Sequence, residues 1–354
     1  MELKESEINY VFDIEQLVKG DILIINEYDE VFTKRLASKY THIALYMGDA
    51  FIIESHGSGV CVSHLYSYGF KENDDGKVFR VNNLCPEDAD RVIEFMSNSL
   101  GMEWNGKHAI DAMKNNNDKY VNSTYCSKLV AQAYASINIP LVANPMICKP
   151  TDFLDLKNGH YLNNPLSHAE EYMKKNILDF KKERDSASNI ESLTDLYQSL
   201  NKVYYPKEQD LQIQTFNQIL ECIFKYPEKD RQASVVIKNS NYFNVEKLKR
   251  DCPWFWNDEE FLKEKNTTER RFYFTNNERL HLRNTFYPFV QKMIDELFLL
   301  NLIGSLSILE LYNGFCRIKS YYLEVDKRLE HLMMLSWEKD STNFETYIDM
   351  YLKK

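Results

Sequence analysis

The sequence predicts an α+β fold in which a domain with an antiparallel sheet precedes an all-α domain. Nine of the eleven glycines lie before residue 160, so the turn-rich part of the chain ends there. Short β-branched segments predict strands in this first part, and apolar residues recur at helical spacing beyond residue 168. Turn formers in residues 158–168 predict a linker, which leaves a first domain of residues 1–160 and a helical domain of residues 168–354.

Five segments of the first domain have the composition of strands. They are short, rich in β-branched or aromatic residues and bounded by glycine or charged turns: residues 21–25, 42–47, 51–55, 60–65 and 78–81. The turn at residues 47–50 joins the second and third as a hairpin. A helix is expected after Pro86, where acidic residues precede the apolar periodicity. Another is expected from Ser123 until residues 138–140 end its pattern.

The second domain is expected to be mostly helical, for example over residues 208–224 and 288–311, with prolines between its segments. Its most apolar stretch, residues 297–309, is shorter than a membrane span and contains Asn301, Ser305 and Ser307. We therefore expect a buried helix there and no transmembrane segment.

Charge and cysteine content narrow the classes of function. The formal net charge of -10 argues against nucleic acid as a partner, because that binding needs lysine and arginine to neutralise phosphates. Residues 1–13 contain neither a basic nor an apolar signal region. Seven cysteines without a Cys-x-x-Cys pair indicate reduced thiols. We expect a cytoplasmic protein, with delivery by a route that needs no cleaved signal left open.

Cys126 lies where a reactive thiol is expected, at the start of the helix predicted after Ser123. The unpaired N–H groups and the dipole of a helix start lower the pKa of a thiol. Ser123 and Thr124 are the candidate N-caps of this helix. A lone cysteine is more often a small buried hydrophobic residue, so catalysis here requires a partner base.

His42 is the candidate base, because it opens an otherwise apolar strand and Glu54 follows across the predicted hairpin. With a three-residue loop at residues 47–49, Glu54 pairs opposite His42 and orients the imidazole as the third member of a triad. A two-residue loop at residues 48–49 places Ser55 there instead. His56, on the same face of its strand as Glu54, is a further alternative for the orienting residue.

Four runs of residues, taken in order, resemble the circularly permuted NlpC-type papain-like hydrolases, the YiiX-like group. They are Gly-Asp-Ile-Leu at 20–23, Thr-His-Ile-Ala-Leu-Tyr-Met-Gly-Asp at 41–49, Ile-Ile-Glu-Ser at 52–55 with Gly-Val at 59–60, and Tyr-Cys-Ser-Lys-Leu-Val at 125–130 with Ala-Tyr at 133–134. In ordinary papain-like enzymes the cysteine helix precedes the sheet that carries the histidine, whereas here the histidine comes first. The resemblance covers about residues 15–155 and implies a circularly permuted papain-like catalytic domain, with the antiparallel sheet followed by the nucleophile helix.

By this resemblance Cys126 is the nucleophile, His42 the base and Glu54 the residue that orients His42. The implied reaction is acyl transfer, in which the thiolate attacks an amide or ester carbonyl and His42 protonates the leaving group. Water or another acceptor then releases the acyl-enzyme. The sequence departs from the family pattern at Lys128, where an acidic residue is expected. This departure bears on substrate preference more than on the chemistry.

Three residues are candidates for substrate contact. Tyr125 and Ser127 flank the nucleophile, and Asp21 opens the first strand, where it either lines the site or forms a strand-end turn.

A metal site is a weaker reading of the residues that follow the hairpin. His56, Cys61 and His64 have suitable side chains, but Cys61 and His64 point to opposite faces of an extended strand. No metal and no other cofactor is expected.

We expect a cysteine peptidase or amidase with a peptide-like or acylated small-molecule substrate. The helical domain would cover or select the substrate, or bind a protein partner. One alternative is a thiol acyltransferase or lipase of the lecithin-retinol acyltransferase type, which usually needs a membrane-anchoring helix. The other is a non-catalytic interaction protein on the same fold, against which the presence of Cys126, His42 and Glu54 argues.

Overall fold

The chain folds into two compact units in a computed structural model. The structure describes residues 3–339 except 58, 105–123, 172, 175–176, 179, 182–187, 208–211, 252, 266–270, 272–273, 276–277 and 281. The first unit comprises Met1–Asn201 and Lys207–Ile219, and the second comprises Lys202–Pro206 and Leu220–Lys354.

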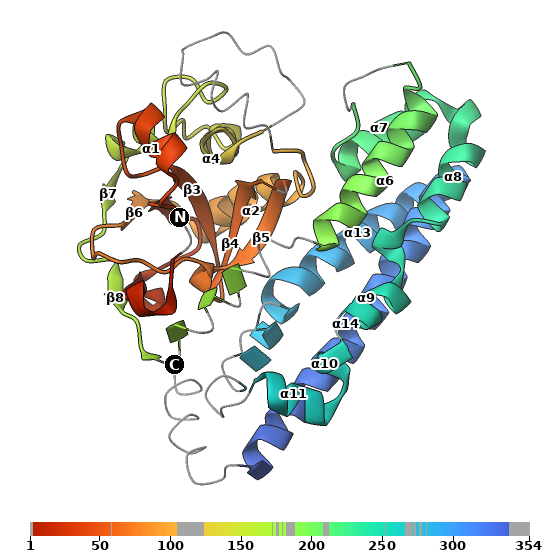
Figure 1. The fold of residues 1–354 in the computed structure, drawn as a ribbon. Helices are drawn as coiled ribbons and strands as arrows, with labels where there is room; N and C mark the ends of the chain where they lie inside the picture. The colour runs from red at the N-terminus through yellow and green to blue at the C-terminus, as the bar shows by residue number, and fades with distance from the viewer. Residues whose placement is uncertain are drawn as a thin grey trace. The chain divides into compact units, whose positions relative to one another are not determined.

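The first unit is built on a six-stranded antiparallel sheet with the strand order β5-β4-β3-β2-β6-β7 (Figure 1). The strands are β2 Ile22–Ile25, β3 His42–Gly48, β4 Phe51–His56, β5 Gly59–His64, β6 Gly76–Val81 and β7 Gly159–Tyr161. The sequence predicted all of these but β7. Every residue of β2 and β3 is buried, so the centre of the sheet is covered on both faces. Two further strands, β1 Tyr10–Phe12 and β8 Leu166–His168, form a separate antiparallel pair.

Helices α2 Pro86–Ser97 and α4 Cys126–Ser136 pack against each other and against the sheet (Figure 1). Pro86 takes the first helical turn of α2, where its missing N–H costs nothing. Beyond the end of α4, Asn138 has a φ of 63°, which stops the helix before Pro140. One core joins these helices to the sheet: Ile43, Leu45 and Ile53 meet Leu129, Val130 and Ala133. This core holds the N-terminus of α4 at a defined place over the sheet. A short helix, α1 Glu30–Leu36, connects β2 to β3.

The β3–β4 hairpin corrects both expected registers. Gly48 pairs with Phe51, so the loop is Asp49–Ala50, and both loop residues have the positive φ that a primed two-residue turn requires. The pairing shifts by one residue between Tyr46 and Gly48, and Ala44 is therefore the Cα partner of Glu54. The loop lies later in the chain than either expected loop, and this is the reason that neither Glu54 nor Ser55 pairs with His42.

The first unit continues beyond the linker expected at residues 158–168, because those residues form β7 and β8. Helix α6 Ser188–Tyr204 then packs at Gly101, where a Cβ would lie only 2.6 Å from Leu193 Cδ2. The hydroxyl of Tyr197 donates a hydrogen bond of 3.1 Å to the carbonyl oxygen of Leu100. Most of α6 is thus part of the sheet-containing unit.

The remaining helices confirm the helical character expected of the C-terminal region. They are α7 Phe216–Lys225, α8 Asp230–Lys238, α9 Val245–Asp251, α10 Pro253–Trp256, α11 Asp258–Glu264, α13 Tyr287–Leu300 and α14 Leu306–Lys339. The carboxylate of Asp230 accepts hydrogen bonds of 2.7 and 2.9 Å from the N–H groups of Leu306 and Ser307. This contact satisfies the first turn of α14 and ties it to α8.

Residues 297–309 do not form the single buried helix that was expected. Helix α13 ends at Leu300, and a 3₁₀ turn at Asn301–Ile303 and Gly304, with a φ of 79°, separate it from α14. A glycine in the left-handed conformation ends a helix, so a turn divides the apolar run. Leu302 in that turn is 83% exposed. Among the described residues, the structure contains no helix long and apolar enough to cross a membrane.

Candidate active site

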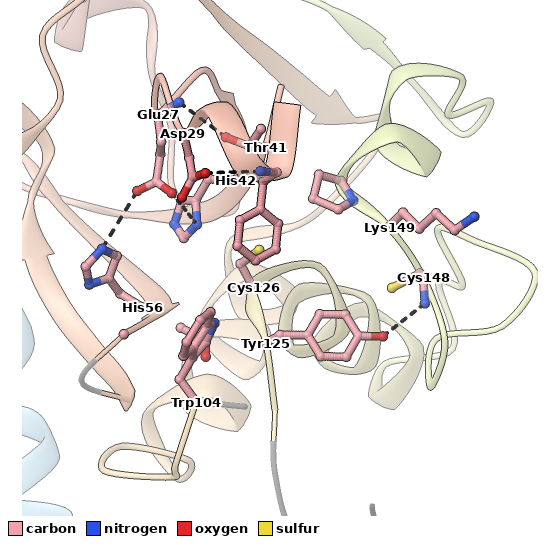
Figure 2. A pocket seen from close by; sticks show the side chains of 14 residues that line it. Glu27, Asp29, Thr41, His42, His56, Trp104, Tyr125, Cys126, Cys148 and Lys149 are labelled. Carbon is pink, nitrogen blue, oxygen red and sulfur yellow. Dashed lines mark hydrogen bonds and ion pairs between the residues drawn. The ribbon is translucent and has the colours of Figure 1, made fainter. Parts of the chain in front are cut away.

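The reactive and ionisable side chains of the candidate site gather at one end of the sheet, where β2 and β4 end and β3 begins. Ile25 pairs with His42, so the residues after Ile25 lie beside the start of β3, and the antiparallel β4 brings Glu54 to the same end. Cys126, at the N-terminus of α4, faces His42 and Glu27 across the site (Figure 2). A cavity of about 160 Å³ opens between them, and its lining includes Glu27, His42, His56, Trp104, Tyr125 and Cys126.

Cys126 is the first residue of α4 and is 8% exposed. The expected caps are not those of the structure: Tyr125 is the N-cap, and its side chain makes no capping hydrogen bond. Thr124 instead bridges Trp104 in extended conformation, which keeps it out of the helix, and Ser123 lies outside the described residues. The start of α4 places the first N–H groups of the helix beside the thiol.

His42 and Glu54 are in direct contact although they are not paired in the sheet. Nε2 of His42 lies 2.6 Å from Oε2 of Glu54, and both side chains are buried. The contact is diagonal, because residues 42 and 44 share a face of β3 and Ala44 is the residue opposite Glu54. The hydroxyl of Tyr68 donates a hydrogen bond of 2.5 Å to the same Oε2, and its ring stacks on the imidazole. His42 and Tyr68 therefore both hold Oε2 of Glu54 in place.

The contact with Glu54 defines the roles of the two ring nitrogens of His42. Nε2 is the ring nitrogen that contacts Glu54, and Nδ1 is the ring nitrogen that Glu54 does not contact. Burial lowers the pKa of His42, but the charges of Glu27 and Cys126 and the bond to Glu54 outweigh it. The pKa of His42 therefore lies well above its ordinary value, which favours the imidazolium at neutral pH.

Glu27 is the residue of this site that the sequence analysis missed. Its Oε2 is 3.7 Å from Nδ1 of His42, and its Oε1 is 3.9 Å from Nε2 of His56. The signal was present in the strand pairing: an antiparallel match of residues 22–25 with residues 42–45 places Glu27 two residues past the partner of His42.

The structure brings together some of the residues expected at the site and separates others. Tyr125 lines the cavity. Asp21 and Ser127 do not line it: Asp21 is buried in an ion pair with Arg80, and the hydroxyl of Ser127 donates to the carbonyl oxygen of Cys148 at 2.9 Å. Lining of the cavity therefore supports substrate contact for Tyr125 alone of these three.

The residue that orients His42 was left open between Glu54 and His56, and the geometry separates them. Glu54 touches Nε2, whereas the ring centroid of His56 is 6.4 Å from that of His42. Lys128, the departure from the expected pattern, is buried in α4.

Metal binding finds no support in the described part of the chain, where no three His, Cys, Asp or Glu side chains are placed to hold one ion. Cys61 lies 3.6 Å from the hydroxyl of Ser63, and the ring of His64 stacks on Phe180.

Comparison with known families agrees with this arrangement. Residues 16–160 match the family described as permuted papain-like amidase enzymes of the YaeF/YiiX type. Comparison with curated proteins gives no match. The matched segment runs from before β2 through α4, so it contains the sheet strand of His42 ahead of the helix of Cys126, which is the permuted order. Residues 16–160 are therefore similar to the permuted papain-like amidases, and by this match the protein is a cysteine hydrolase.

Proposed function

We propose that this hydrolase cleaves an amide bond through a thioester acyl-enzyme, with Cys126 as nucleophile, His42 as general acid and base, and Glu54 as orienting residue. The observation that carries the proposal is the buried contact of 2.6 Å between Nε2 of His42 and Glu54, which leaves Nδ1 for Cys126. The raised pKa of His42 supports an imidazolium as the partner of a thiolate.

Each step follows from this placement. The Cys126 sulfur attacks the carbonyl carbon and forms a C–S bond, while the oxyanion accepts a hydrogen bond from the backbone N–H of Cys126. The C–N bond then breaks as Nδ1 of His42 transfers its proton to the leaving amine. Water attacks the thioester and gives a proton back to Nδ1, and the C–S bond breaks to release the carboxylic acid. The enzyme returns to its thiolate and imidazolium forms.

The cavity supports a compact substrate, either the end of a peptide or an acylated small molecule. Its volume of about 160 Å³ suits one side chain or a short acyl group, and Trp104 and Tyr125 offer aromatic contact. A cytoplasmic location is part of the proposal, supported by free thiols at all six cysteines of the described residues. Exposed apolar side chains such as Leu302 support a protein partner for the helical unit.

Alkylation with iodoacetamide and mass spectrometry test the nucleophile. Cys126 is expected to react far faster than the other cysteines, and the preference should disappear in His42→Ala. Equal, slow labelling of all the cysteines would contradict the proposed site. A library of amide and ester reporters then identifies the acyl-enzyme at Cys126. Release of a free acid supports hydrolysis, and transfer to an added amine or alcohol supports the acyltransferase alternative.

A further inference from the structure

Glu27 is a second carboxylate beside the imidazole of His42, at the ring nitrogen that Glu54 does not use. Its Oε2 lies 3.7 Å from Nδ1, and its Oε1 lies 3.9 Å from Nε2 of His56. Both distances are longer than a hydrogen bond, so Glu27 acts on the two rings through its charge and does not take a proton from either of them directly. Its side chain is 21% exposed and lines the cavity.

Local structure holds Glu27 at this place. Its backbone N–H donates a hydrogen bond of 3.4 Å to Oγ1 of Thr41, the residue before His42. The Tyr68 hydroxyl, which binds Glu54, also lies 3.3 Å from Oε1 of Glu27. The nearby Asp29 has a different task, since its carboxylate caps α1. Glu27 is thus the acidic side chain of this segment that is directed at His42 (Figure 2).

Several titratable groups face His42 from the elements packed around it. Among the described residues they are Glu27 after β2, Glu54 and His56 on β4, Tyr68 after β5, and Cys126 on α4. Glu54 acts at Nε2, whereas Glu27 and Cys126 act on the Nδ1 side. In the tetrahedral intermediate the sulfur has given its charge to the new C–S bond, so the imidazolium no longer has a thiolate as its partner. The carboxylate of Glu27 is not consumed in the reaction.

We propose that Glu27 is a second positioning residue for His42, which stabilises the proton on Nδ1 while the sulfur of Cys126 is bonded to substrate. The inference rests on the proposed role of His42. Because Glu27 stays beyond hydrogen-bond distance, the Nδ1 hydrogen remains free to point at the leaving group. His42 thus works between two carboxylates, one that orients the ring and one that holds its charge.

The pH dependence of alkylation at Cys126 tests this role without knowledge of the substrate. Iodoacetamide is neutral and reports the thiolate. Iodoacetate is an anion, so its rate relative to iodoacetamide falls as the imidazolium loses its charge. The midpoint of this ratio against pH is therefore the titration of His42. In Glu27→Gln the midpoint is expected to move down by about 1 to 2 pH units, the usual effect of an opposite charge within 4–6 Å.

Matched variants separate charge from structure. Glu30→Gln makes the same chemical change on the exposed side of α1 and is expected to leave the midpoint in place. Glu27→Asp keeps the charge, so its midpoint should lie close to the wild-type value. Glu27→Ala should show the same downward shift as Glu27→Gln, and it replaces Glu27→Gln in the test if Glu27→Gln does not fold. Thermal unfolding of each variant records any purely structural effect.

The outcomes distinguish this inference from the proposal beneath it. Selective labelling of Cys126 with the same midpoint in wild type, Glu27→Gln and Glu27→Ala would overturn the role of Glu27 and leave the Cys126–His42 site intact. A shift of equal size in Glu30→Gln would also overturn it, since it would show only a general effect of charge. Absence of selective labelling in the wild type would overturn the proposed function itself.

Discussion

Replacement of Glu54 by glutamine should remove the charged hydrogen bond that orients His42, while the shape of the site stays unchanged. Glu54 is fully buried, and its Oε2 lies 2.6 Å from Nε2 of His42. A hydrogen bond to a charged partner contributes about 1.5 to 3 kcal/mol, and glutamine retains an acceptor oxygen but not the charge. In the proposed mechanism the imidazolium form of His42 acts in the transition state, so kcat/KM should fall by about 10- to 150-fold, at a factor of ten for each 1.36 kcal/mol.

The measurement is kcat/KM for an amide reporter that the wild type accepts, with thermal unfolding as the check on folding. Asp75→Asn is the matched control, because Asp75 is also a buried carboxylate and accepts hydrogen bonds from Asn26 and Tyr28, but it makes no contact with His42. This control should lose stability and keep kcat/KM once folded. A Glu54→Gln enzyme with wild-type kcat/KM and an intact fold would refute the assignment of Glu54.

Outcomes for four further variants are expected from stability measurements. Asp21→Ala breaks an ion pair that has two short contacts to Arg80. It should lower the free energy of unfolding by about 3 kcal/mol in denaturant titrations. The folded variant should still be alkylated selectively at Cys126. Ser127→Ala removes a buried hydrogen bond and should cost about 1 kcal/mol, whereas Ser55→Ala should cost nothing, because the buried hydroxyl of Ser55 has no hydrogen-bond partner among the described residues. The folded pKa of His42 is raised above 6.5, so its stabilising contribution is present below pH 6.5 and is lost as the pH rises through the folded value; His42→Asn should flatten this alkaline decline of stability.

The partnership of His42 and Glu54 could be read from the sequence, but the geometry that produces it could not. Strand composition identifies the two segments and their hairpin. The number of residues in the loop decides which side chains pair, and the sequence offers Met47, Gly48 and Asp49 with equal plausibility as turn residues. The structure uses Asp49 and Ala50 and adds a bulge. The contact survives because a diagonal pair on one face is within reach of long side chains.

The placement of other side chains depends on contacts between residues that are distant in sequence. Glu27 has no motif of its own, and only the antiparallel pairing of β2 with β3 brings it to His42. Asp21 and Ser127 were expected to contact substrate, yet their side chains bind Arg80 and the carbonyl oxygen of Cys148 instead. Adjacency along the chain is therefore a weaker guide than strand pairing.

The apolar run at residues 297–309 shows a limit of composition. Hydrophobicity indicated burial, and a single residue, Gly304, changed the outcome by taking a left-handed conformation that divides the helix. Whether a glycine continues or ends a helix depends on the packing of the helices on either side of it.

The packing of α6 against Gly101 has a practical consequence for production of the catalytic segment. The match to the amidase family stops at residue 160, and a gene trimmed to that point would omit Leu193 and Tyr197. The truncated protein would present the bare backbone of Gly101 and the unbonded carbonyl oxygen of Leu100 to water, next to β5, to which the N–H of Gly101 is bonded. A minimal fragment for crystallisation or for screening inhibitors should therefore extend through residue 219, the end of the first unit.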